Sequence, residues 1–128
     1  MGMYTEIFFA AEVDEEAFDL LSKIKETGDI PEGQTHPFFF SPRALQVFHD
    51  GSFYFPGACH FEVEFEEIGS TRSVSFRGNL KNYNGEIEAF FDWVAPHCKA
   101  GSGNRNFIGY SIYEDSDAMP VPYFAKGQ

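Results

Sequence analysis

HFEVEFE, residues 60–66, alternates apolar and acidic side chains with the two-residue period of a β-strand. The apolar positions are Phe61, Val63 and Phe65. The acidic positions between them are Glu62, Glu64 and Glu66. Because successive side chains of a strand point to opposite faces, this stretch predicts a strand with one face on a core and one acidic face.

The stretch that follows predicts the partner of this strand. Gly69 and Ser70 are turn residues, and residues 72–80 then repeat the alternation of apolar and polar side chains. The two stretches predict an antiparallel hairpin. Arg72 and Arg77 are expected to pair with glutamates across it.

The N-terminal region predicts a strand followed by a helix. Residues 4–13 are dense in apolar side chains and predict a strand that is buried on both faces. Asp14 is a good N-cap for a helix, and Gly28 is a good C-terminal stop. Between them, one apolar stripe of helical period contains Ala17, Phe18, Leu20, Leu21 and Ile24.

The central region is harder to assign. Residues 29–37 predict a loop, after which residues 38–40 return to the core. Ser41 followed by Pro42 predicts a single helical turn. Residues 45–49 and 53–55 predict two short strands across an Asp-Gly turn.

The C-terminal part adds a second helix and two strands. Asn84 is its expected N-cap, and Pro96 its expected end. Its apolar stripe contains Ile87, Phe90, Phe91 and Val94. Residues 107–113 and 121–124 predict the last strands.

The strands come in antiparallel runs, with two helices set between them. This order predicts an α+β domain with an antiparallel sheet and two helices on one face. The nearest common pattern is the ferredoxin-like split β-α-β arrangement, with inserted strands. We expect residues 1–128 to form one domain, because a chain of this length can bury a core of its own.

The composition of the chain indicates its cellular compartment. The N-terminus lacks the basic segment of a signal peptide, and no stretch is long and apolar enough to span a membrane. Two cysteines in such a chain suggest free thiols in a reducing compartment. We therefore expect a cytoplasmic protein.

The formal net charge of −11 limits the partners. Direct binding to nucleic acid or to an anionic membrane requires a basic surface. We therefore expect neither, and a protein with a basic surface is the partner that the charge permits. The simpler interpretation is that the acidity only keeps the protein soluble. The oligomeric state stays open.

Rows of acidic residues are the candidate surface for binding such a partner. The glutamates of residues 60–66 would stand about 6.7 Å apart along one strand face, and Glu67 would extend the row. Further acidic groups lie on the first helix, at Glu15, Glu16 and Asp19, and on the second, at Glu86, Glu88 and Asp92. Such rows resemble the charge of nucleic acid and would fit a basic groove, although ordinary solvated faces are acidic too. Exposed tyrosines, with Tyr54 as the first candidate, would add contact area; the others are Tyr83, Tyr110, Tyr113 and Tyr123.

Catalytic motifs are weak in this sequence. Cys59-His60 and His97-Cys98 combine metal-ligating residue types, but neighbouring residues of a strand point to opposite faces and cannot easily hold one ion. A nucleophile pair of Cys98 with His36, His49 or His60 lacks an orienting residue or an oxyanion loop. No phosphate-binding or dinucleotide motif occurs. We predict no metal, no cofactor and no catalytic residue.

Four motifs occur together along the chain. They are MYTE at residues 3–6, NLKNY at 79–83, EI through FDW at 86–93, and FIGY with YE at 107–114. In this combination the sequence resembles a family of small phage and prophage proteins of uncharacterised function. It departs from that family at residues 38–48, where the relatives are richer in Trp and basic residues. The motifs belong to a fold, so no functional residue carries over.

The resemblance implies an accessory protein of a mobile element in a bacterial cytoplasm. Together with the acidity, it favours a non-enzymatic inhibitor that binds a host defence complex of the CRISPR or nuclease type. A small thiol- or metal-dependent enzyme and a virion or assembly protein are the alternatives.

Overall fold

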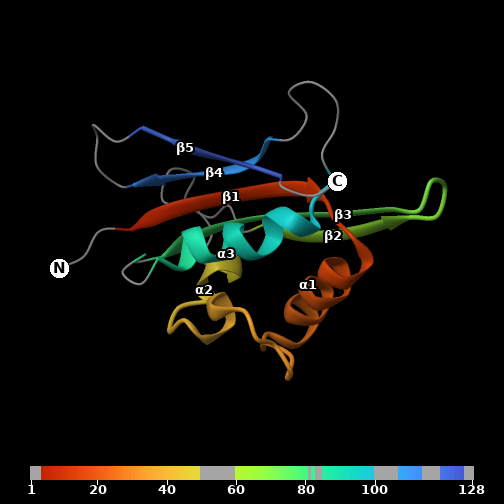
Figure 1. Ribbon diagram of the computed structural model, residues 1–128, viewed down its shortest axis with the longest axis horizontal. Helices are drawn as coiled ribbons and strands as arrows, with labels where there is room; N and C mark the ends of the chain where they lie inside the picture. Colours follow the sequence, from red (N-terminus) through yellow and green to blue (C-terminus); the bar gives the residue numbers. More distant parts are fainter. Residues whose placement is uncertain are drawn as a thin grey trace.

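The computed structural model describes residues 4–49, 60–80, 82, 85–99, 107–113 and 119–125. Five strands form one antiparallel sheet in the order β2-β3-β1-β4-β5 (Figure 1). The strands are β1 (Thr5–Glu12), β2 (His60–Glu66), β3 (Thr71–Leu80), β4 (Phe107–Tyr113) and β5 (Val121–Phe124). The helices α1 (Glu15–Thr27) and α3 (Glu86–Val94) lie on the same side of the sheet. The prediction of an α+β fold with an antiparallel sheet is confirmed.

The order of the first four strands is that of a split β-α-β arrangement. β1 leads through α1 to β2, and β3 lies between these two strands. β1 is central, so that Phe9 is opposite Phe76 of β3 on one side and Gly109 of β4 on the other. The additional strand, β5, lies beyond β4 at the edge of the sheet.

The predicted strand over residues 45–49 is wrong, because this segment forms turns followed by the short helix α2 (Gln46–His49). Helical spacing brings Ala44, Val47 and Phe48 to one side, and all three are buried. The ring of Phe48 lies 4.9 Å from that of Phe76 in β3. Packing under the sheet therefore overrides the strand preference of the local sequence. The other predicted inserted strand, 53–55, lies outside the described residues.

Both predicted ends of α1 are confirmed. The Asp14 side chain accepts a hydrogen bond from the backbone N–H of Ala17 at 2.9 Å, and Gly28 has a left-handed conformation with φ of 77°. The first satisfies an N-terminal amide, and the second is the usual way in which a helix stops. The buried stripe of α1 contains Ala17, Leu20, Leu21 and Ile24, with Phe18 half-buried.

The start of α3 differs from the prediction. Its N-cap position is Gly85, one residue after the predicted Asn84, which lies outside the described residues. The amide of Ile87 instead donates to Oδ1 of Asn82 at 2.9 Å. A side chain five residues before the amide thus supplies the capping contact. A 3-10 turn, η2 (Ala95–His97), continues the helix past Val94.

A second 3-10 turn, η1 (Pro37–Phe40), precedes the turn that was predicted to start at Ser41. Residues 42–45 do form turns, and the amide of Ala44 donates to the carbonyl of Ser41 at 3.2 Å. Phe38 and Phe39 enter the core as predicted, whereas Phe40 is 71% exposed. Phe38 contacts Phe90 of α3, and Phe90 also contacts Phe9 and Phe76. Rings from the sheet, η1 and α3 therefore form one core layer.

No helix within the described part of the chain has the length and apolar character needed to cross a bilayer.

Candidate functional site

The three glutamates of β2 form one exposed row, which we call the acidic strip. The alternating residues Phe61, Val63 and Phe65 face the side of the sheet that carries the helices, because Phe61 contacts Phe48 and Phe65 contacts Phe18. Glu62, Glu64 and Glu66 therefore project from the outer face, the side turned away from α1 and α3. β2 is an edge strand, so the strip lies along one border of that face.

Beside the strip the outer face is hollowed by a depression of about 320 Å³. Glu62 is opposite Ser75, Glu64 is opposite Ser73, and Ala10 of β1 continues the row next to Ser75. The side chains next to the two carboxylates are thus short. The hollow is lined by Ala10, Ala11, Glu62, Glu64, Ser73, Val74 and Ser75.

The predicted pairing of Arg72 and Arg77 with glutamates across the hairpin is wrong, because neither arginine is opposite a glutamate of β2. Arg72 is opposite Phe65, and its guanidinium lies 4.8 Å from the centre of that ring. It therefore faces the side away from the strip. Arg77 is opposite His60, and its guanidinium lies 5.5 Å from the Phe8 ring. Among the described residues, no glutamate of the strip has an ion-pair partner.

The other predicted binding residues do not join the strip in one surface. Glu15, Glu16 and Asp19 are exposed on α1, which packs against the opposite side of the sheet. Glu16 and Asp19 line a separate pocket of about 270 Å³. Glu67 is exposed in the turn after β2. Tyr54 lies outside the described residues.

The prediction that Glu86 of the second helix belongs to an acidic surface is wrong. Its side chain is fully buried, and its Oε2 accepts a hydrogen bond from the backbone N–H of Arg43 at 3.2 Å. It stabilises the segment that leads into α2. Glu88 and Asp92 are exposed as predicted.

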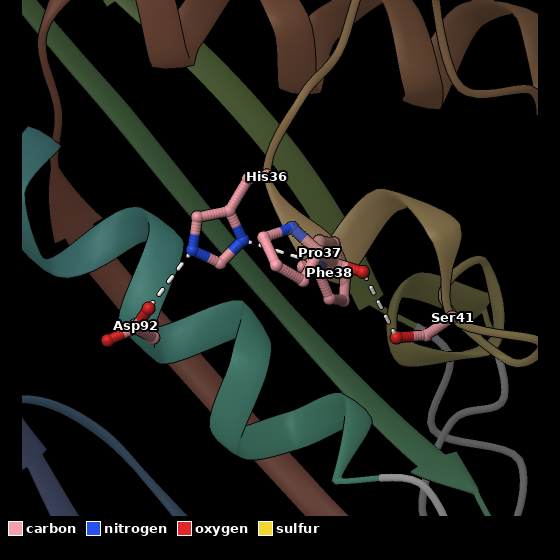
Figure 2. A network of polar contacts seen from close by, with 5 residues as sticks. All are labelled: His36, Pro37, Phe38, Ser41 and Asp92. Atoms are coloured by element: carbon pink, nitrogen blue, oxygen red, sulfur yellow. Dashed lines mark hydrogen bonds and ion pairs between the residues drawn. The ribbon is translucent and has the colours of Figure 1, made fainter.

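Asp92 is held by His36, in an arrangement that the sequence did not indicate. Oδ2 of Asp92 lies 3.0 Å from Nε2 of His36, and Nδ1 of His36 accepts a hydrogen bond from the amide of Phe38 at 3.1 Å (Figure 2). Since Nδ1 accepts, the neutral ring carries its proton on Nε2 and donates it to Asp92. The histidine thereby caps η1 and ties it to α3. A His directly before a Pro-initiated turn is the local signal for such a cap.

The pair His97-Cys98 has a structural position. Nδ1 of His97 lies 2.8 Å from Oδ2 of Asp14, the cap of α1. Cys98 forms an isolated bridge with Val13 and is buried. Burial, and secondarily the charge of Asp14, raises the pKa of the Cys98 thiol to about 12. A nucleophilic cysteine needs the opposite shift.

The described residues contain no cluster of three or more His, Cys, Asp or Glu side chains that is suited to a metal ion. Cys59 lies outside the described residues, as do the side chains of His49 and His60. Of the candidate partners of Cys98, His36 contacts Asp92 instead.

The tyrosines of the C-terminal strands are partly covered. Tyr110 is stacked on Phe8 with a centroid distance of 5.7 Å, and Tyr123 is stacked on Phe91 at 3.8 Å. Burial is the main cause that raises the pKa of both hydroxyl groups. Tyr113 is 44% exposed, whereas Tyr83 lies outside the described residues.

No family model matches the chain, and no curated protein and no solved structure is significantly similar to it.

Proposed function

We propose that this protein is a non-enzymatic inhibitor that binds a basic surface on a nucleic-acid-binding protein through the acidic strip. Following the resemblance of its motifs to phage proteins, we assign it to a phage or other mobile element. Its target would be a host defence complex of the CRISPR or nuclease type, in the bacterial cytoplasm.

The observation that carries this proposal is the acidic strip itself. Three carboxylates at alternate positions of one strand are exposed and lack ion-pair partners among the described residues. Opposite charges that face each other directly across two neighbouring strands stabilise a sheet. Here the residues directly opposite are Thr71, Ser73 and Ser75, and none of the three carries a positive charge.

A row of this kind suits a groove that binds a nucleic-acid backbone. Successive carboxylates are about 6.7 Å apart along the strand, and phosphates repeat at spacings of several ångströms. Lys and Arg side chains of such a groove would reach the carboxylates, and the hollow beside Glu62 and Glu64 gives them space. The net charge of −11 would attract the groove over a distance and accelerate association.

The test is an affinity capture from the lysate of a bacterial host, followed by elution with duplex DNA. We expect a nucleic-acid-binding defence protein to be captured by the wild type and released by DNA. The purified target should lose its nuclease or DNA-binding activity at a one-to-one ratio of inhibitor, because a non-enzymatic inhibitor acts stoichiometrically. Calorimetry gives the affinity and the ratio.

Two triple variants with equal change in charge make the test specific. Glu62→Lys, Glu64→Lys and Glu66→Lys together should weaken the complex at least a hundredfold, about 3 kcal/mol. The control replaces the exposed Glu26, Asp29 and Glu32 by Lys and should reduce affinity only through the general field. Equal losses in the two variants would remove the strip from the proposal, and inhibition far below stoichiometric amounts would contradict a non-enzymatic mechanism.

A further inference from the structure

A second pocket of about 320 Å³ lies at the other side of the sheet, between α3 and β5. It is distant from the acidic strip in the topology, because β2 and β5 are the two opposite edges of the sheet (Figure 1). Its lining residues are Glu88, Phe91, Asp92, Ala95, Pro122, Tyr123, Phe124 and Ala125. Carboxylates and aromatic rings thus share one concave surface.

The two carboxylates come from the same helix, one turn apart. Glu88 and Asp92 are at positions i and i+4, where Cβ atoms are about 5–6 Å apart. Like charges at this spacing destabilise an isolated helix. A cation between the two side chains would remove this repulsion.

Each carboxylate is also positioned by one hydrogen bond. Oε1 of Glu88 accepts a hydrogen bond from Nδ2 of Asn82 at 2.8 Å. Oδ2 of Asp92 accepts one from Nε2 of His36 at 3.0 Å (Figure 2). In each case the second oxygen accepts no hydrogen bond from the described part of the chain. Asp92 is 67% exposed despite its contact with His36. Both groups are therefore oriented and able to accept a further donor.

The aromatic rings of the pocket are held by contacts with neighbouring side chains. Tyr123 is parallel to Phe91, with an angle of 4° between the rings, and its hydroxyl lies 3.2 Å from Oγ of Ser111. Phe124 is 47% exposed and contacts Phe107 at 5.9 Å between ring centroids. Aromatic surface next to carboxylates attracts a cation through both the ring quadrupole and the charge.

We propose that the pocket between α3 and β5 is a receptor site for an arginine side chain of a partner protein. The planar guanidinium carries five donors in a fixed fork, so one group can bridge two carboxylates and stack on an aromatic ring at the same time. A lysine ammonium is a compact point charge without a face for stacking. The site is independent of the acidic strip and would be a second anchor for a basic partner.

The size of the pocket favours a side chain of a protein over a larger free ligand. Pockets for drug-sized molecules range from about 300 to 1,000 Å³, so this pocket is at the small end of that range. An arginine is also among the side chains that most often anchor an interface.

The test is an NMR titration of the full-length, isotope-labelled protein with the blocked peptide acetyl-Gly-Arg-Gly-amide. We expect saturable shifts of α3 and β5 amide signals, with a dissociation constant on the order of 1 mM for this single side chain. The same peptide with citrulline, a neutral analogue of arginine, should give no saturable shift. The lysine peptide should bind more weakly than the arginine peptide.

Two double variants test whether the arginine peptide binds at Glu88 and Asp92. The double variant Glu88→Gln, Asp92→Asn should weaken arginine binding about tenfold, because it keeps the acceptors for Asn82 and His36 but removes both charges. The control double variant Glu62→Gln, Glu64→Gln removes the same net charge at the strip and should leave binding unchanged. An unchanged far-ultraviolet circular dichroism spectrum and an unchanged midpoint of urea unfolding verify the fold of each variant.

Several outcomes would overturn the proposal. They are absent or unsaturable shifts at α3 and β5, equal binding of the citrulline or lysine peptide, and equal weakening by the two double variants. Tighter binding of free arginine than of the blocked peptide would also overturn it, in favour of a small-molecule site. None of these results depends on whether the strip binds a defence complex, so the two proposals fail separately.

Discussion

Gly78 shows how strongly a single position can depend on tertiary contacts. A Cβ atom at this residue would overlap the backbone carbonyl of Val47 and lie 3.0 Å from Cγ2 of Ile7. α2 packs so closely on β3 that only glycine fits between them. The sequence indicates nothing of this, since a glycine inside a strand has several explanations.

We predict that Gly78→Ala lowers the free energy of unfolding by about 3 kcal/mol, because the overlap involves backbone atoms that cannot move aside. Urea unfolding measures the loss. The control is Gly33→Ala, where the new Cβ meets no atom within 4 Å and only the positive φ of 91° is unfavourable. It should cost about 1 kcal/mol. Equal effects would contradict the close approach of α2 to β3.

Cys98 gives a second prediction for a single residue. In a Cys59→Ser background, Cys98 should react with a thiol reagent at pH 8 at least a hundredfold more slowly in the native protein than in urea. With a pKa of about 12, only about one thiol in ten thousand is ionised at that pH, and the side chain is also 1% exposed. Rapid, stoichiometric labelling of the native protein would contradict this and reopen thiol chemistry.

The raised pKa of Cys98 also fixes the direction of a pH effect. The folded protein keeps this proton at pH values where the unfolded chain, with a thiol pKa near 9.0, releases it. The contribution of Cys98 to stability is therefore complete below pH 9 and is lost as the pH rises from 9 towards 12.

At the scale of elements, Asp14 connects β1, α1 and the segment after α3. One carboxylate oxygen caps α1 at Ala17, and the other contacts His97. The backbone strengthens the junction, since Asp14 donates to the carbonyl of His97 and Lys99 donates to that of Glu12. The sequence predicted the cap but not the connection across 83 residues.

We predict that Asp14→Ala costs about 1.5 kcal/mol of unfolding free energy, because it removes the cap and the partner of His97. Asp14→Asn is the matched control, since its side-chain oxygen still caps Ala17, and it should cost less than half as much near neutral pH. The midpoints of urea unfolding measure both. If the two variants were equally unstable, the cap would contribute nothing.

Elements with a clear period were predictable, and the central segment was not. The strands at 60–66 and 107–113 and the ends of α1 follow from alternation and capping signals that act within a few residues. Residues 45–49 have side chains that suit a strand, but their place under the sheet requires helical spacing. That choice depends on Phe76 and Phe90, which are far away in the sequence.

For the whole molecule, the expectation that the chain forms one domain can be tested by the cooperativity of its unfolding. β1 has neighbours on both sides, and the core joins rings from both ends of the described chain. We predict that urea transitions coincide when followed by far-ultraviolet circular dichroism and by fluorescence of Trp93, the one tryptophan. Trp93 packs against Phe39 and reports on the helical layer, whereas dichroism reports on all elements. Two separate transitions would contradict a single cooperative unit.

The net charge of the chain follows directly from its sequence, but the distribution of the charges over the molecular surface does not. From the sequence alone, the acidic residues of β2, α1 and α3 were all equal candidates for binding a partner. The structure separates the strip from the acids of α1 by the sheet, buries Glu86 and places Glu88 and Asp92 in a pocket with Tyr123. A sequence pattern gives the face of one element, but not which elements meet.

The sequence by itself determined the α+β class, the hairpin with its acidic face and the caps of α1, because period and capping act between residues close in the chain. The tertiary structure alone decided that residues 46–49 are helical, that Glu86 is buried, and that Glu88 and Asp92 face β5 across a pocket. These features depend on contacts between distant segments, and such contacts exist only once the sheet and its helices have packed together.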